Sequence, residues 1–499
     1  KRLAADAGVV LAEIERATGR LAEARTRLEQ LTASDPRHLA ARCQLGLVYE
    51  TTGLTDQASK LWDRFIDEWN DGTIDRDSAE ALLYVAIAAR HSGAVKDANE
   101  TFQEAVGKDD RLLEANLEWG RLFLEKYAAG EAEKSFDEVL EFDPNNADAH
   151  AGMARVKLEQ GYEVVGAKKH VARALATNPR HPDALRVRAQ LEIDNEEYAR
   201  ADKTLGEVLA VNSADLDALA LRAAIAWLTD DLSAYEERKR RVLALNPRFA
   251  RFFHLVAEFA EKAHRYPEAI ALEEEGLAID PSYTDALAAI GTGYLRLGDE
   301  KKGIERLGQA FERDTFNVRA YNTLNLYDDV IPKSYELATS PHFRYRLAKA
   351  ERPVLSRYLP RLLEQAFADM VKRYGFTPTV PVTIELYADP DHYSVRTVGL
   401  PNLGALGVCF GKVITALSPA NGNVNWGMVL WHELGHVFAI QLSRSRVPRW
   451  FTEGLSEYET ILARPEWRRE NDFDVWMALE SGKLPSVVAS GSPPGSLAR

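Results

Sequence analysis

Residues 280–315 read DPSYTDALAAIGTGYLRLGDEKKGIERLGQAFERDT, and they contain one complete unit of a pattern that recurs through the first two thirds of the chain. The unit begins at a short polar turn, Asp280-Pro281, and ends at the next turn, which starts with Asp314. We expect each unit to be a helical hairpin, in which small residues let two helices approach and a large aromatic residue fills the space between them. The Asp/Asn-Pro turns are expected to cap one helix and to start the next.

The polar turns recur at an almost constant interval. From residue 110 onward, the spacing between successive turns is 34 residues five times and 35 residues once. The second residue of each of these turns lies at position 110, 144, 179, 213, 247, 281 or 315. The earlier gap, between residues 36 and 110, has room for two units and a short insertion, which we place around residues 69–77. A fixed period predicts a stack of repeats, because one hairpin alone cannot bury its apolar face.

The residues inside the units resemble a known repeat family. One unit has Leu45-Gly46, Tyr49, Gly53 and Ala58, another has Ile290-Gly291, Tyr294, Gly298, Gly303 and Ala310, and a weaker copy has Trp119-Gly120, Phe123, Ala132 and Phe136. In these residues and in its period, the array resembles the tetratricopeptide repeat. The resemblance implies an all-α superhelical solenoid of about nine hairpins over residues 1–330. Its concave face is expected to bind a protein partner or substrate, and the alternative is a spacer with no defined ligand.

The composition of the chain restricts its domain number and its partners. Its 499 residues exceed the length at which single cores stop growing, which predicts at least two domains. The net charge is −14, and residues 341–499 carry 18 basic and 15 acidic residues, so the acid excess lies in the first 340 residues. This charge disfavours nucleic acid and anionic membranes as the main partners. The sequence contains no apolar run long enough for a transmembrane helix.

The last third of the chain has a different pattern, which is typical of an α+β domain. We expect strands at Phe343–Ala348 and Val382–Tyr387, a strand or hairpin at 407–415, and helices at 354–374 and 426–442. The predicted fold is therefore multi-domain, with the solenoid at residues 1–330 and an α+β domain at residues 331–480. Residues 481–499 are expected to be a linker or the start of a truncated C-terminal region.

The apolar helix expected at 426–442 carries the sequence H-E-L-G-H at residues 432–436. On a helix, His432 and His436 lie on one face and can bind the same ion, with Glu433 beside them. A second expected helix follows Pro448 and places Glu453 17 residues after His436. Two imidazoles and one carboxylate, with a fourth position open for water, form a ligand set for catalytic zinc.

These two helices resemble the gluzincin metallopeptidases. The match consists of H-E-L-G-H followed by P-R-W-F-T-E-G-L-S-E-Y-E, and it is most specific to the peptidase MA-like domains that bacteria attach to tetratricopeptide arrays. The resemblance covers roughly residues 341–462. It implies that His432, His436 and Glu453 bind Zn²⁺ and that Glu433 is the general base. It also implies that Glu457 orients a ligand histidine.

The roles implied by this resemblance predict a zinc metallopeptidase. The zinc ion would activate a water molecule, and Glu433 would accept its proton and pass it to the leaving amine. The substrate is expected to lie antiparallel to an edge strand, for which Val408–Thr415 is the candidate. Gluzincins also carry a later Tyr or His that stabilises the oxyanion, but this sequence has neither after Tyr458. The alternatives are Tyr458 itself, which is so close to Glu453 that packing is the more common role, a donor located beyond Arg499, or a weakly active domain.

A second function stays open, namely a non-catalytic protein-interaction scaffold with a vestigial peptidase-like domain. Cys43 and Cys409 are too few and too far apart for a disulfide framework, and we expect Cys409 to be a strand residue. Glu459 is expected to lie on the surface. Resembling proteins are often exported in bacteria, which favours the periplasm or cell envelope, with the cytoplasm as the alternative.

Overall fold

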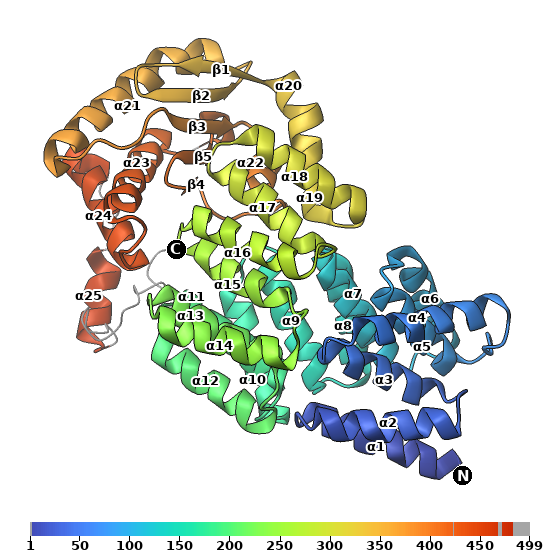
Figure 1. Cartoon of the computed structure of the whole chain (residues 1–499). Coiled ribbons are helices and arrows are strands. Elements are labelled where there is room, and N and C mark those ends of the chain that lie inside the picture. The colour runs from blue at the N-terminus through green and yellow to red at the C-terminus, as the bar shows by residue number, and fades with distance from the viewer. Residues whose placement is uncertain (1, 423, 468–471, 483–499) are drawn as a thin grey trace. The chain divides into compact units, whose positions relative to one another are not determined.

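The computed structural model describes residues 2–422, 424–467 and 472–482 (Figure 1). The chain divides into two compact units. The first consists of Lys1–Leu191 and Ala199–Leu255, and the second consists of Glu192–Tyr198 and Val256–Arg499. None of the described helices is both long enough and apolar enough to cross a lipid bilayer.

The N-terminal part of the chain consists of consecutive helices, and the described residues form nine helical hairpins. In chain order these are α1 (Arg2–Ala17) with α2 (Leu21–Ser34), α3 (Leu39–Thr51) with α4 (Thr55–Asn70), α5 (Ala79–His91) with α6 (Val95–Lys108), α7 (Leu113–Glu125) with α8 (Ala129–Phe142), α9 (Ala147–Glu159) with α10 (Val164–Thr177), α11 (Pro182–Asp194) with α12 (Tyr198–Val211), α13 (Leu216–Leu228) with α14 (Leu232–Leu245), α15 (Arg251–Lys262) with α16 (Tyr266–Ile279), and α17 (Thr284–Arg296) with α18 (Glu300–Arg313). The longer connection between α4 and α5, residues 71–78, confirms the predicted insertion.

The polar turns between hairpins end one helix but do not begin the next. Asp143 follows the last residue of α8, and its Oδ1 accepts a hydrogen bond of 3.2 Å from the backbone N–H of Asn145. The N-cap of α9 is Asn146, whose side chain accepts a hydrogen bond of 3.0 Å from the N–H of Ala149. The expected start at the Asp-Pro pair was therefore wrong by three residues, because the Asp side chain is occupied in closing its own turn.

The small residues of the repeat pattern are positions of close helix approach. Phe136 on α8 lies against Gly120 of α7 and Gly152 of α9, where a Cβ atom would stand 2.7 and 2.4 Å from its ring. Gly46 on α3 meets the buried ring of Trp62 in the same way, with a Cβ position 2.2 Å from it. One aromatic ring thus fills the space between helices only because its neighbours have no side chain.

A row of ion pairs connects the first helices of successive hairpins in the first unit. Arg90 on α5 contacts Glu118 on α7, Arg121 on α7 contacts Asp148 on α9, and His181 lies 3.5 Å from the same Asp148. The row continues through Arg186, which pairs with Asp183 and Asp215, and through Arg251, which pairs with Asp217 at 3.1 Å. Acidic and basic side chains therefore neutralise each other from hairpin to hairpin along this row.

The repeat pattern ends in a helical segment that leads into a sheet. α19 (Val318–Asn325), a π-helical turn (Leu326–Val330) and α20 (Ile331–Ser334) run directly into β1 (Tyr335–Thr339). The remaining strands are β2 (Phe343–Ala348), β3 (Val382–Tyr387), β4 (Gly407–Cys409) and β5 (Val413–Leu417), in the order β1-β2-β3-β5-β4. β2, β3 and β5 are parallel, whereas β1 and β4 are antiparallel to their neighbours. The sheet is therefore mixed, as in an α+β domain.

One face of the sheet packs against two long helices. α21 (Arg352–Tyr374) and α23 (Trp426–Ser443) contribute leucines, valines and Phe438 to a buried cluster that includes Tyr345, Ile384 and Ile414 from adjacent strands. The two helices were expected at 354–374 and 426–442, so their positions are confirmed to within two residues. The cluster fixes α23 against the sheet, and α23 is the helix that carries H-E-L-G-H.

The other face of the sheet carries buried charge. Glu385 on β3 accepts hydrogen bonds from Arg346 at 3.0 Å and from Arg396 on α22 (Pro390–Val398) at 2.8 and 2.9 Å. Burial alone would raise the pKa of Glu385, but these two guanidinium groups lower it to about 2. Arg396 also donates to the carbonyl oxygen of Leu295 on α17, and Arg346 pairs with Glu300 on α18 at 2.7 Å. The last hairpin is therefore bonded to this face of the sheet.

The strands at 343–348 and 382–387 are confirmed, and the segment 407–415 is a hairpin of β4 and β5. β1 was not predicted, because it continues from a helical segment without a turn residue. The boundaries at residues 330 and 480 stay predictions. Most of the segment 481–499 lies outside the described residues.

Replacing Gly46 by Ala should lower the free energy of unfolding by about 1–3 kcal/mol, because the added methyl group overlaps the Trp62 ring. Gly107→Ala is the matched control, since Gly107 is exposed on α6 and a Cβ there meets no atom within 4 Å. Helix propensity makes the control neutral or stabilising by up to about 1 kcal/mol. Urea unfolding followed by circular dichroism measures the stability of both variants. Equal midpoints of the Gly46→Ala and Gly107→Ala unfolding curves would contradict the packing argument.

Candidate metal centre

Two consecutive helices, α23 and α24 (Arg449–Ala463), carry the candidate metal ligands. α23 begins after Asn425, whose side chain accepts a hydrogen bond of 3.2 Å from the N–H of Met428. α24 follows Pro448, which offers no capping side chain. Instead, the carboxylate of Glu196 in the α11–α12 turn accepts a hydrogen bond of 2.9 Å from the N–H of Arg449. A carboxylate at a helix N-terminus stabilises the helix, so a repeat turn secures the start of α24.

The close approach of α23 and α24 depends on Gly435, the fourth residue of H-E-L-G-H. A Cβ atom at this position would lie 2.8 Å from Ser456 Oγ and 3.0 Å from Ser456 Cα. Ser456 is fully buried on α24, one turn after Glu453. Because no side chain separates the two helices here, Glu453 reaches the face of α23 that carries both histidines.

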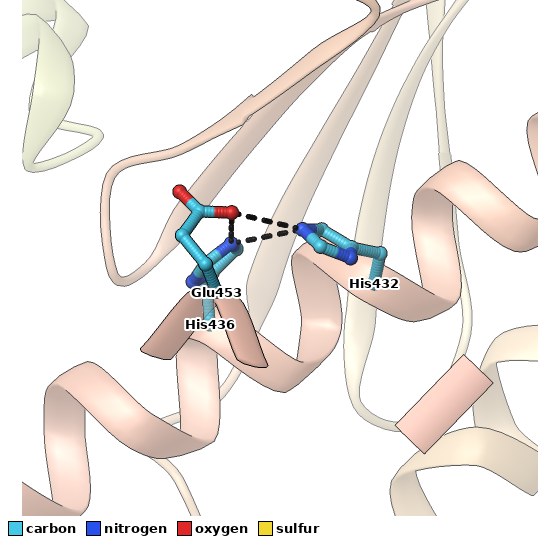
Figure 2. A group of neighbouring side chains, drawn as sticks. All are labelled: His432, His436 and Glu453. Carbon is cyan, nitrogen blue, oxygen red and sulfur yellow. Dashed lines mark hydrogen bonds and ion pairs between the residues drawn. The ribbon is translucent and has the colours of Figure 1, made fainter. Parts of the chain in front are cut away.

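The structure brings the three predicted ligands together (Figure 2). His432 Nε2 lies 3.1 Å from His436 Nε2, and Glu453 Oε2 lies 3.5 Å from each of these nitrogens. A tetrahedral zinc ion with bonds of about 2.0–2.1 Å requires ligand atoms about 3.3 Å apart. Among the described residues this is the one group of three or more His, Cys, Asp or Glu side chains with such convergence. The donor set therefore fits zinc in its chemistry and in its spacing.

The electrostatics of the centre favour a bound cation. Burial would lower the pKa of His432, but the carboxylates of Glu453 and Glu457, each 3.5 Å from a ring nitrogen, outweigh burial and raise that pKa to about 9. Burial likewise would raise the pKa of Glu453, whereas the two histidines hold it well below its usual range. The carboxylates thus stabilise positive charge at the histidine nitrogens, and a divalent ion would supply that charge in place of protons.

Glu433 lies beside the ligands and is almost completely buried. Burial raises the pKa of this carboxyl group, while His436 and His432 act against the increase. Its side chain lies against Gly407, the first residue of β4, where a Cβ atom would stand 2.9 Å from Oε1. A buried carboxylate with a raised pKa next to a sheet edge is suited to accept and release a proton.

Two further acidic residues on α24 have different positions. Glu457 Oε2 lies 3.5 Å from His432 Nδ1, on the side of the ring opposite the candidate metal position, which is where an orienting acid would lie. Glu459 is buried rather than on the surface, so that expectation was wrong. It accepts hydrogen bonds from Arg373 at 3.1 Å and from Tyr374 at 2.6 Å. These bonds attach α24 to the C-terminal end of α21.

Sequence reasoning missed a histidine that the repeat array contributes to this region. Burial, together with the charges on His436 and Arg449, lowers the pKa of His264 to about 4. His264 follows α15, 168 residues before His432 in the chain. The sequence offered one signal for it. His264 occupies the turn position at which the next hairpin has Gly298, so a histidine replaces a glycine of the repeat pattern. The roles of the predicted ligands, of Glu433 and of Glu457 stay predictions.

The comparisons with known proteins concern the repeat array. Residues 9–64 and 43–112 match the tetratricopeptide repeat family. A solved tetratricopeptide repeat protein from Parabacteroides merdae is 18% identical, with 50% of this chain and 99% of that chain covered and a TM-score of 0.34. Yeast Tom70 is 10% identical and has a TM-score of 0.34, and the match covers 65% of this chain and 82% of the Tom70 chain. Pseudomonas aeruginosa pilF is 22% identical and has a TM-score of 0.31, and the match covers 44% of this chain and 97% of that chain.

Among curated proteins, no sequence matches the chain. The family match and the repeated hairpins establish a tetratricopeptide repeat protein with a long helical array, followed by a region with a small mixed sheet. Such repeats imply a scaffold for protein–protein interaction. The matched residues lie outside the region of the candidate metal centre, so its identity as a gluzincin belongs to the proposal below.

The metal-free chain should bind one zinc ion, as measured by competition with a chromogenic chelator. His436→Ala and Glu453→Ala should each weaken binding more than Glu457→Gln, for which about 10–100-fold is expected of a residue that orients a ligand. His342→Ala is the control, because His342 pairs with Glu364 outside the centre. Equal zinc affinity of His436→Ala and His342→Ala would contradict the assignment.

Proposed function

We propose that the chain is a zinc-dependent metallopeptidase of the gluzincin type, in which the repeat array binds a protein substrate or partner. The observation that carries the proposal is the convergence of His432, His436 and Glu453 at tetrahedral spacing, with the buried carboxylate of Glu433 beside them. The match of residues 9–112 to tetratricopeptide repeats supports the binding role of the array.

His432 and His436 would hold Zn²⁺ through Nε2, and Glu453 would hold it through a carboxylate oxygen. The ion would supply Lewis acidity, which lowers the pKa of water and polarises an amide carbonyl group. Glu433 accepts a proton from water as the water oxygen bonds to the carbonyl carbon. It then delivers this proton to the amide nitrogen as the C–N bond breaks, which regenerates the carboxylate and releases an acid and an amine.

The free edge of β4 supports a place for the substrate. β4 is the terminal strand of the described sheet and pairs with β5 alone. An extended peptide can add to such an edge through main-chain hydrogen bonds. Gly407 brings this edge against Glu433, so a peptide paired with β4 would run past the proton acceptor. The segment expected from the sequence, Val408–Thr415, includes the last two residues of the edge strand β4 and the first three of the inner strand β5.

The zinc-loaded full chain should cleave an unfolded protein such as casein, and Glu433→Gln should reduce the rate by about 10²–10⁴-fold while zinc binding is retained. Glu336→Gln is the matched control, because Glu336 lies on β1 at the opposite edge of the sheet. Release of peptides is measured by mass spectrometry. Background cleavage by both wild type and Glu433→Gln would favour the scaffold with a vestigial peptidase-like domain.

A further inference from the structure

The α15–α16 turn belongs to the repeat array but bonds to the segment that follows α23. The carbonyl oxygen of His264 accepts a hydrogen bond of 3.1 Å from Ser445 Oγ. Glu268, at the start of α16, lies 3.5 Å from Arg446. These contacts attach the turn to the α23–α24 connection, between the two helices that carry the metal ligands.

A second set of contacts attaches the same turn to the sheet edge. Tyr266 is buried, and its ring meets Phe410 edge-on with 6.1 Å between centroids. Both rings belong to one buried cluster with Val413, and Val408 of β4 packs against that cluster. The turn is therefore fixed from two sides, by the strand edge next to Glu433 and by the connection after His436.

The imidazole of His264 is oriented within this setting. Its Nδ1 lies 3.0 Å from the hydroxyl oxygen of Tyr266, which leaves Nε2 as the ring nitrogen that can meet a substrate. The turn that carries this ring bonds to the α23–α24 connection, and charges on His436 and Glu453 act on the pKa of His264. An imidazole with one nitrogen engaged this way can present an N–H at the other, whether neutral or protonated.

The backbone of this turn is a third observation. His264 has φ of +59°, a conformation that side-chain-bearing residues rarely adopt. The equivalent turns use Gly19, Gly53, Gly93 and Gly298 in four hairpins, where the conformation has no steric cost. In other hairpins a non-glycine residue adopts it, as at Glu196 and Asp230. The conformation is therefore a property of the repeat, and what distinguishes His264 is that its turn contacts both the α23–α24 connection and the sheet edge.

We propose that His264 is a catalytic residue of the metal centre, supplied by the repeat array, and that its imidazole N–H donates a hydrogen bond to the carbonyl oxygen of the bound peptide. The inference rests on the proposed function. As the water oxygen bonds to the carbonyl carbon, the C=O electron pair moves onto the carbonyl oxygen, and the N–H of His264 stabilises that charge without transferring its proton. When the C–N bond breaks, the electron pair returns to re-form C=O.

The experiment uses the zinc-loaded full chain and two variants of the same turn position. His264→Gly removes the imidazole and places glycine where four equivalent turns already have it, so the turn is retained. Asp230→Gly is the matched control, because Asp230 has φ of +56° at the equivalent position of the α13–α14 turn. Tyr266→Phe keeps the packing on Phe410 and removes only the hydroxyl group that orients the ring.

Four quantities are measured for each protein: zinc affinity, peptidase kcat, peptidase KM, and the affinity for N-phosphoryl-leucinamide, the last by calorimetry. The tetrahedral, anionic phosphoryl group of this probe resembles the carbonyl carbon after water has added. We expect His264→Gly to lower kcat by about 10²–10³-fold with little change in KM, as for the loss of one oxyanion donor. Probe binding by His264→Gly should weaken at least tenfold, and its zinc affinity should be unchanged. The kcat and the probe affinity of Tyr266→Phe should lie between those of His264→Gly and wild type.

Wild-type probe binding and kcat in His264→Gly would overturn the inference. Loss of zinc affinity in that variant would also overturn it, because His264 would then act on the metal site itself. A wild-type chain that binds neither zinc nor the probe would refute the proposed function, and the inference with it. The zinc titration of wild type distinguishes this failure from the other two.

Discussion

The geometry of the metal centre depends on one steric constraint, the contact of Gly435 on α23 with Ser456 on α24. The two helices approach so closely that a Cβ atom at residue 435 would lie inside the contact distance of Ser456. At this separation Glu453 Oε2 reaches 3.5 Å from both histidine nitrogens. A side chain at residue 435 would push α24 away, and a carboxylate displaced by even 1 Å would no longer match zinc–oxygen bonds of about 2.0–2.2 Å.

Other parts of the second unit maintain this helix pair from outside. Glu459 bonds to Arg373 and Tyr374 and so fixes the middle of α24 to α21, while Glu196 bonds to the first N–H of α24. The sheet beneath α23 is in turn held on its other face by Glu385 and two arginines. Buried charges of this kind are tolerated only when they are paired, so their partners in α17 and α18 form part of the structure that supports the centre.

The sequence was sufficient for features that have a local signature. The 34-residue period predicted the hairpins, because each repeat is one supersecondary unit with its own small residues and aromatic residue. H-E-L-G-H placed two histidines on one helix face through the helical period alone, and Glu453 followed from a second helix nearby. β1, Glu196, the burial of Glu459 and His264 were not accessible in this way. β1 continues from a helical segment without a turn residue. The other three depend on partners far along the chain, and Glu196 lies 253 residues from Arg449.

The missed residues share a location that bears on the role of the repeats. Glu196, His264 and Glu268 lie on or next to turns inside hairpins, and all three contact the α23–α24 connection or the first residue of α24. Two of them, Glu196 and His264, have a backbone conformation that favours glycine. The turns of the α11–α12 and α15–α16 hairpins therefore contact the chain around the α23–α24 connection, between the two helices that carry the candidate ligands.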